Sequence, residues 1–200
     1  MDMRLVPEFL SNRLVILLAA CVIVVLPGAC IWWYLRQQAA RSIAARLKQA
    51  SDGLLAGILV PGVDGGHIHL EYAALTRQGI VIVDVRDVAG NVFGSEPMQE
   101  WTVLGRKRRF TFANPLPALY DRIAAVKRLV PDVPVRGAVA FTARAEFSKG
   151  FPPNVVMLDT LLADLAAARN ITDGLSPELL RGAWERLGQS AAAGASRLVT

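Results

Sequence analysis

The sequence predicts an α/β fold with a mixed, α+β-like sheet that is flanked by helices and preceded by one transmembrane helix. Three observations lead to this prediction. Residues 14–35 carry no charge. Residues 68–141 contain short runs rich in β-branched side chains, each bounded by glycine, proline or asparagine, which is the pattern of strands and turns. Residues 116–130 place apolar side chains at helical spacing.

The uncharged stretch 14–35 is long enough to cross a membrane. Its 22 residues would rise about 33 Å as a helix, against about 30 Å for a hydrocarbon core. Trp32, Trp33 and Tyr34 stand at its end, where aromatic rings favour the headgroup level. A cleaved signal peptide would have a shorter apolar run, and lipidation at Cys21 would need a polar segment after the cysteine. We therefore expect a single transmembrane helix in contact with the lipid bilayer.

The charges that flank this stretch predict its orientation. Two basic residues precede it, whereas four follow it within about fifteen residues: Arg36, Arg41, Arg46 and Lys48. Basic flanks stay on the cytoplasmic side. We expect a single-pass protein of the cell (inner) membrane, with residues 1–13 as a short external tail and the C-terminal domain in the cytoplasm.

Composition excludes several classes of protein. The chain has 200 residues, 53% of them hydrophobic, which excludes disorder. Its two cysteines lie within the apolar stretch, so no disulfide framework or cysteine metal site is expected. The net charge is +5, but the first 50 residues contribute +4 of it. The rest of the chain is therefore nearly neutral, which is low for a domain that binds phosphate backbones.

The elements after the membrane segment follow in order. Residues 37–59 are rich in alanine and leucine without proline and are expected to form a helix that packs on the sheet, ended by the glycines of 61–66. Strands are expected at 68–75, 80–86, about 99–104 and 107–113, all in one central sheet, then a helix at 117–129 and a strand at 134–141.

Further elements are expected towards the C-terminus. They are a strand at 155–158, helices at 157–168 and 177–187, and a frayed tail from 191 to 200. Ser176 before Pro177 is the typical start of a helix, as N-cap and first position. Val81, Val83, Trp101 and Phe141 are expected in the core.

Three charged side chains on neighbouring strands form a candidate site. Asp84 and Arg86 are two apart on the most β-branched strand and therefore leave the same face. Glu71 lies on the preceding strand, opposite them in a hairpin. Two carboxylates together with phosphate oxygens suit Mg²⁺. The alternatives are a surface ion pair of Asp84 with Arg86, an exposed Glu71, and a metal site formed by His67, His69 and Glu71.

A basic run, Arg106, Lys107, Arg108 and Arg109, interrupts the second predicted hairpin. Such a run is usually a solvated turn, and its alternative is a contact with nucleic acid.

Residues 66–165 resemble the nuclease-related domain (NERD) family, within the restriction-endonuclease-like fold. The matching features are Gly79-Ile80 leading to Val83-Asp84-Val85-Arg86, then Gly90, Gly94 and Trp101, then Asn114-Pro115-Leu116 before a helix, and Gly137 to Phe141. The chain then divides into a tail (1–13), a transmembrane helix (14–35), a juxtamembrane helix and loop (36–65), a nuclease-related domain (66–169) and a C-terminal helix with its tail (170–200).

The resemblance implies roles for the three site residues. Glu71 takes the place of the first acid and Asp84 that of the second, and both would bind a divalent metal. Arg86 stands where the family has a lysine that orients or activates water. Residues 42–59 contain no glutamate, although the family usually supplies one there. Because arginine stays charged, Arg86 does not act as a base, and catalysis is expected to be weakened.

Three functions remain open at this point. The first is a membrane-anchored, catalytically weakened domain that binds nucleic acid, through residues 106–109, or a protein partner. The second is an active Mg²⁺-dependent nuclease with Glu71 and Asp84 as metal ligands. The third is a non-enzymatic adaptor that uses the fold as a scaffold. An open site with converging carboxylates favours the second function and a filled site the third; no small-molecule cofactor is expected.

Overall fold

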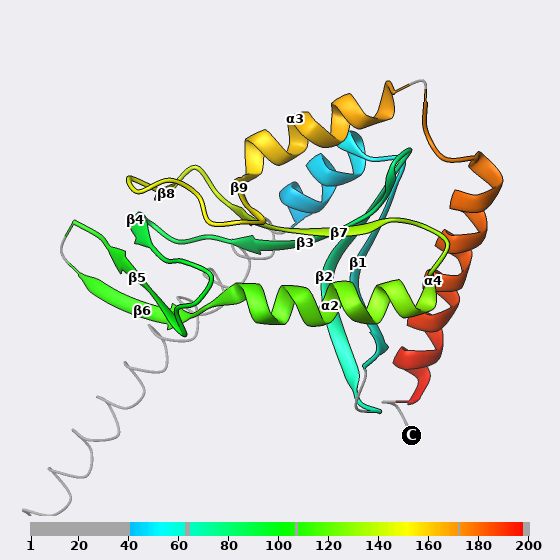
Figure 1. The fold of residues 1–200 in the computed structure, drawn as a ribbon, viewed down its shortest axis with the longest axis horizontal. Helices are drawn as coiled ribbons and strands as arrows, with labels where there is room; N and C mark the ends of the chain where they lie inside the picture. The colour runs from blue at the N-terminus through cyan, green and yellow to red at the C-terminus, as the bar shows by residue number, and fades with distance from the viewer. Residues whose placement is uncertain (1–40, 63–64, 107, 172, 198–200) are drawn as a thin grey trace, which may run out of the picture. The chain divides into compact units, whose positions relative to one another are not determined.

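The computed structural model describes residues 41–62, 65–106, 108–171 and 173–197. The chain divides into two units, and the second, Ala44–Thr200, contains every labelled strand and helix of Figure 1. The predicted external tail and transmembrane helix, residues 1–35, lie outside the described residues. Among the helices that the structure does describe, none has the length and apolar character needed to cross a membrane.

A mixed five-stranded sheet forms the centre of this unit. Its strand order is β1-β2-β3-β7-β9. Strands β1, β2 and β3 pair antiparallel in that order, whereas β7 pairs parallel with β3 on one side and with β9 on the other. The predicted mixed sheet is therefore confirmed. The strands are β1 (Gly53–Pro61), β2 (His67–Thr76), β3 (Gly79–Arg86), β7 (Val135–Phe141) and β9 (Val155–Met157).

The second predicted hairpin exists, but its place in the central sheet was wrong. It belongs to a separate four-stranded sheet with the order β6-β5-β4-β8. The reason is that β3, the strand before the hairpin in the sequence, already pairs with β2 on one side and β7 on the other, so the hairpin does not pair with it and joins β4 and β8 instead. The strands are β4 (Gly90–Phe93), β5 (Glu100–Leu104), β6 (Arg109–Ala113) and β8 (Ala145–Glu146).

The predicted helix over 37–59 was wrong in its second half. A helix covers residues 41–50, and the chain then turns into β1, which pairs with β2 along most of its length. Gly57 within β1 has a φ of 63°, which a residue with a side chain adopts at a cost. The apolar run after Gly53 therefore serves as an edge strand of the sheet, where pairing outweighs helix propensity.

Helices cover both faces of the central sheet (Figure 1). The contacts of α2 (Pro115–Leu129) are with β1, β2, β3 and β7, and it also touches α4 (Pro177–Arg197). On the opposite face, α3 (Leu158–Arg169) contacts β2, β7 and β9. The helical residues 44–50 lie beside α3, joined to it by the ion pair of Arg46 with Asp159.

The two faces give the sheet two apolar layers. Ile80 and Ile82 of β3 belong to the main core, together with Leu119 of α2. Val81 and Val83 point to the other face and are also buried, as predicted. Every β3 side chain from Ile80 to Asp84 is therefore shielded from water, which explains the near-continuous apolar run of this strand.

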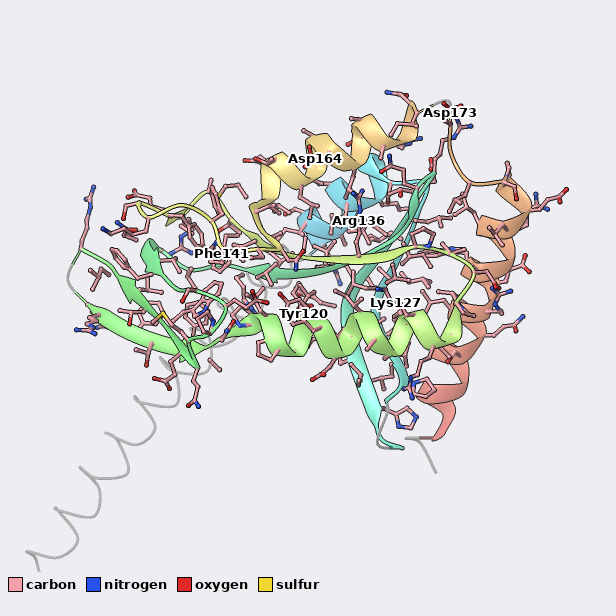
Figure 2. The ribbon with its side chains drawn as sticks, in the orientation of Figure 1. Tyr120, Lys127, Arg136, Phe141, Asp164 and Asp173 are labelled. Atoms are coloured by element: carbon pink, nitrogen blue, oxygen red, sulfur yellow. The ribbon has the colours of Figure 1, made fainter. Side chains whose placement is uncertain are left out.

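Aromatic rings connect the two sheets. Trp101 of β5 stacks against Phe141 at the end of β7, with ring centroids 6.3 Å apart, and Figure 2 labels Phe141 where β7 reaches the second sheet. Both side chains are fully buried. Their predicted core positions are confirmed.

Helix α4 begins as predicted but ends later than predicted. The hydroxyl of Ser176 accepts the N–H of Leu179, as expected of an N-cap. The prediction of a frayed tail from residue 191 was wrong for the backbone up to Arg197, because α4 continues to that residue. Alanine-rich residues have high helix propensity, which explains this extension.

Candidate functional site

The two predicted acids lie where β2 and β3 separate. The paired register runs from Thr76 and Gly79 to Tyr72 and Val83 and stops there. Glu71 and Asp84 are the next residues along each strand. Beyond them β2 continues beside β1, while β3 runs on towards the second sheet (Figure 1). We call this point the fork.

Asp84 is buried at the fork. Its side chain is 2% exposed and lies on the face of β3 that α2 covers. Its Oδ2 accepts a hydrogen bond of 2.8 Å from Nη1 of Arg122, and Nη2 of Arg86 lies 3.9 Å away. Its Oδ1 is buried and has no hydrogen-bond partner among the described residues. Burial raises the pKa of Asp84, and the charges of Arg122 and Arg86 oppose this rise.

Arg122 of α2 bridges the two strands at the fork. While its Nη1 binds Asp84 of β3, its Nε donates a hydrogen bond of 2.8 Å to the carbonyl of His69 on β2. The pairing of β2 with β3 has already ended there, so the guanidinium spans the gap between the strands.

Sequence reasoning missed Arg122, although a signal existed. Arg122 follows Leu119 by three residues and precedes Val126 by four, so it lies on the apolar stripe of α2. A charged side chain on such a stripe needs a buried partner. Asp84 is that partner.

Glu71 is half-buried rather than solvent-exposed. Its Oε2 accepts a hydrogen bond of 2.9 Å from the backbone N–H of Val85. The side chain therefore satisfies a β3 donor that β2 no longer reaches. Burial raises the pKa of Glu71, and the neighbouring charge of Asp84 raises it further, while the bond from Val85 opposes the rise.

The third predicted residue, Arg86, lies at the edge of this cluster. Its side chain is 38% exposed, and Asp84 is its acidic neighbour. The structure thus brings Glu71, Asp84 and Arg86 together, and it adds Arg122. The alternative of a simple surface ion pair does not fit, because Asp84 is buried and Arg122 is its nearer partner.

The charges of the cluster do not suit a divalent metal. The two carboxylates of Glu71 and Asp84 face the two guanidiniums of Arg86 and Arg122, so the cluster is close to neutral. One oxygen of each acid already accepts a hydrogen bond. Among the described residues, Oδ1 of Asp84 is a fully buried side-chain acceptor without a hydrogen-bond partner. Because two guanidiniums already compensate the two carboxylates, the cluster offers little net attraction for a doubly charged cation, and these residues do not fit Mg²⁺.

The histidine alternative also fails for the residues that the structure describes. Across these ranges, no three histidine, cysteine, aspartate or glutamate side chains are grouped so that they could hold a metal ion. His67, His69 and Glu71 occupy every second position of β2 and do not make such a group.

The basic run lies at the turn between β5 and β6, apart from the fork. Arg106, Arg108 and Arg109 are exposed, and Lys107 is outside the described residues. Two exposed apolar side chains flank the run, Leu104 at 45% and Phe110 at 43% exposure. Strand β6 is the edge of its sheet. We call residues 104–110 the basic hairpin.

The comparisons with known proteins give one match. The model of the nuclease-related domain family matches residues 34–142, which is more than half of the chain. No curated protein and no solved structure matches the chain. The matched range contains the fork, the basic hairpin, and also the helix of residues 41–50 and β1. The chain belongs to the nuclease-related domain (NERD) family.

Proposed function

We propose that this chain is a membrane-anchored member of the family, with a restriction-endonuclease-like core, that binds nucleic acid but is catalytically weakened. The observation that carries the proposal is the contact at the fork: the carboxylate of Asp84 is held by Arg122, and Arg86 stands in the lysine position. Family membership supports a nuclease-related function. The departures at the fork support binding without efficient cleavage.

Hydrolysis of a phosphodiester needs an activated water and charge stabilisation at the phosphate. Arg86 remains protonated at any physiological pH, so it does not accept a proton from water. Its guanidinium still offers donors that match phosphate oxygens. At 38% exposure, these donors are accessible from solvent. The cluster therefore retains a group for binding phosphate and lacks one for activating water.

The basic hairpin provides the second contact with nucleic acid in this proposal. Exposed Arg106, Arg108 and Arg109 attract phosphates, and Lys107 adds a fourth positive charge in the sequence. The exposed ring of Phe110 offers a face on which a base can stack. Arginines beside an exposed aromatic ring favour single strands, whose bases are free to stack.

A membrane anchor is part of the proposal and rests on the sequence alone. Residues 14–35 would span the inner membrane, residues 1–13 would lie outside, and the family domain would lie in the cytoplasm. A reporter fused after Thr200 tests this topology. A fluorescent protein should be bright and alkaline phosphatase inactive; an active phosphatase with a dark fluorescent protein contradicts the orientation.

A second candidate function is that of an adaptor that binds a protein partner. The observation that favours it is that β6 is the edge of its sheet among the described residues, with Phe110 exposed on it and Leu104 exposed on the neighbouring β5. Such an edge can pair with a strand from a partner. Phe110→Ser would weaken this contact while keeping all four charges of the hairpin.

The test uses the full chain in detergent micelles with fluorescently labelled single-stranded DNA, RNA and duplex DNA. Fluorescence anisotropy should show binding that weakens steeply with added salt, and denaturing gels should recover the nucleic acid intact. The absence of binding at low salt would contradict the proposal and leave the adaptor function.

A further inference from the structure

We infer that Arg122 is a built-in counter-ion of the fork, occupying the electrostatic place that a divalent metal would take, so that the wild-type site binds no metal. This inference rests on the proposed function, because it explains why the domain would bind nucleic acid without cleaving it. It concerns a residue on α2 that lies outside the two strands expected to carry the site.

Two hydrogen bonds fix the position of the Arg122 guanidinium. Arg122 makes hydrogen bonds of 2.8 Å both to Asp84 of β3 and to the carbonyl of His69 on β2. Its side chain is 19% exposed, half the exposure of Arg86. Two hydrogen bonds at the ends of one planar guanidinium hold this group in place. Arg122 is therefore a fixed part of the fork rather than a mobile surface charge.

The charge balance of the fork depends on Arg122. The charged groups that influence Asp84 are Arg122 of α2, Arg86 of β3 and His69 of β2, and Glu71 is the other acid at the fork. The two arginines balance the two carboxylates. Without Arg122 the two carboxylates would keep only Arg86 and His69 as neighbouring positive groups, and the fork would lose one full positive charge. A buried excess of negative charge is the condition under which a site attracts a divalent cation.

Arg122 also occupies an oxygen atom of Asp84. Arg122 donates its hydrogen bond to Oδ2 of Asp84, so a substitution that removes the guanidinium frees this oxygen. Oδ1 of the same carboxylate already lacks a partner. Removal of the guanidinium therefore leaves both oxygens of Asp84 available, close to Glu71. The same substitution creates the charge and the ligands that a metal needs.

The inference predicts a gain of metal binding in Arg122→Gln. The free Mn²⁺ signal in electron paramagnetic resonance measures binding to the full chain in detergent. Wild type should bind no more Mn²⁺ than Asp84→Asn does. Arg122→Gln should bind one Mn²⁺ per chain at least about tenfold more tightly than wild type.

Two further variants make the result specific. Arg128→Gln removes an exposed arginine from the same helix and should bind Mn²⁺ as wild type does. The double variant Glu71→Gln with Arg122→Gln should lose the gained binding, because it removes one of the two carboxylates. A gain that survives Glu71→Gln would place the metal elsewhere and overturn the inference.

Two other outcomes also overturn it. One is a folded Arg122→Gln, checked by circular dichroism, that gains no Mn²⁺. The other is a wild type that binds one Mn²⁺ that is lost in Asp84→Asn. If Arg122→Gln does not fold, Mn²⁺ binding is compared between wild type and Asp84→Asn alone. Equal Mn²⁺ binding by these two chains supports the inference. A wild type that binds Mn²⁺ at Asp84 yet cleaves nothing overturns this inference and leaves the proposed function standing.

Discussion

Nη1 of Arg122 lies 2.8 Å from Oδ2 of Asp84, and the Asp84 side chain is 2% exposed. This contact joins α2 to the central strand at the point where β2 and β3 separate. It connects the fold to the proposed function, because the same guanidinium that contacts the sheet compensates the charge of the acid that we propose as the former metal ligand.

Loss of Arg122 should destabilise the domain. In Arg122→Gln the buried Asp84 loses its hydrogen-bonded cation, and Arg86, whose Nη2 lies 3.9 Å from Oδ2, makes no hydrogen bond to it. Breaking a buried pair in this way costs about 3 kcal/mol of unfolding free energy. Urea unfolding of the full chain, followed by tryptophan fluorescence, measures the difference.

Arg128→Gln is the matched control for that measurement. Arg128 lies on the same helix but is exposed, with a single weak bond of 3.4 Å to the carbonyl of Pro61. Its loss should change the unfolding free energy by less than about 0.5 kcal/mol. Equal effects of the two substitutions would show that Arg122 stabilises the domain no more than a surface arginine does.

The raised pKa values of Glu71 and Asp84 predict how stability depends on pH. Burial raises both in the folded chain, whereas in the unfolded chain they lie near 4. The folded chain therefore binds these protons more tightly. The contribution of the two groups to the unfolding free energy must fall as pH rises from about 4 through the raised values.

Glu71→Gln isolates one of these two groups. A glutamine keeps an oxygen that can accept the N–H of Val85 and has no proton to lose. The unfolding free energy of Glu71→Gln minus that of wild type should therefore be larger at pH 7 than at pH 4. Urea unfolding at the two pH values measures this difference, and the opposite trend would mean that burial does not dominate the pKa of Glu71.

The regular parts of this fold could be predicted from local pattern. The β-branched run of β3 and the apolar spacing of α2 each specify an element without reference to the rest of the chain. Strand β1 could not be predicted in this way, because its leucines continue the alanine- and leucine-rich run of the preceding helix, and pairing with β2 makes it a strand.

Only the part of the candidate site that depends on local sequence spacing could be predicted. Glu71, Asp84 and Arg86 lie on adjacent strands of one hairpin, so their spacing brings them together. Arg122 is 38 residues from Asp84 along the chain and reaches it only through the packing of α2 on the sheet. A tertiary contact of this kind has no local signature beyond a charge on an apolar stripe.

Gly94 should be intolerant of any side chain. A Cβ at this position would overlap the indole ring of Trp101, which is fully buried and donates a hydrogen bond to the carbonyl of Ser95. Gly94→Ala should therefore lower the unfolding free energy by about 2–3 kcal/mol through overpacking. Gly188→Ala is the control, since a Cβ there meets no atom within 4 Å and alanine favours a helix. Thermal unfolding should place Gly94→Ala well below wild type and Gly188→Ala at or above it; equal midpoints would contradict the packing described here.

The basic hairpin should determine how nucleic-acid binding depends on salt. Each phosphate contact contributes about 0.7 to the slope of log affinity against log salt for a single strand. Replacing all four basic residues, Arg106 to Arg109, by glutamine should lower affinity and flatten the slope by up to about 3. A control of equal charge change uses exposed residues elsewhere: Lys127, Arg128, Arg136 and Arg181. Equal slopes for the two quadruple variants would mean that the hairpin is not the contact.

The rate of nucleic-acid cleavage decides whether the fork is a catalytic site. Single-turnover cleavage of plasmid, single-stranded DNA and RNA by the full chain is measured with Mg²⁺ or Mn²⁺, beside Asp84→Asn. We predict that wild type is no faster than Asp84→Asn, because Arg122 already compensates Asp84 and Arg86 does not activate water. A wild-type rate more than about tenfold above that of Asp84→Asn, equal to about 1.4 kcal/mol of barrier, would show that the fork is an active metal-dependent nuclease site.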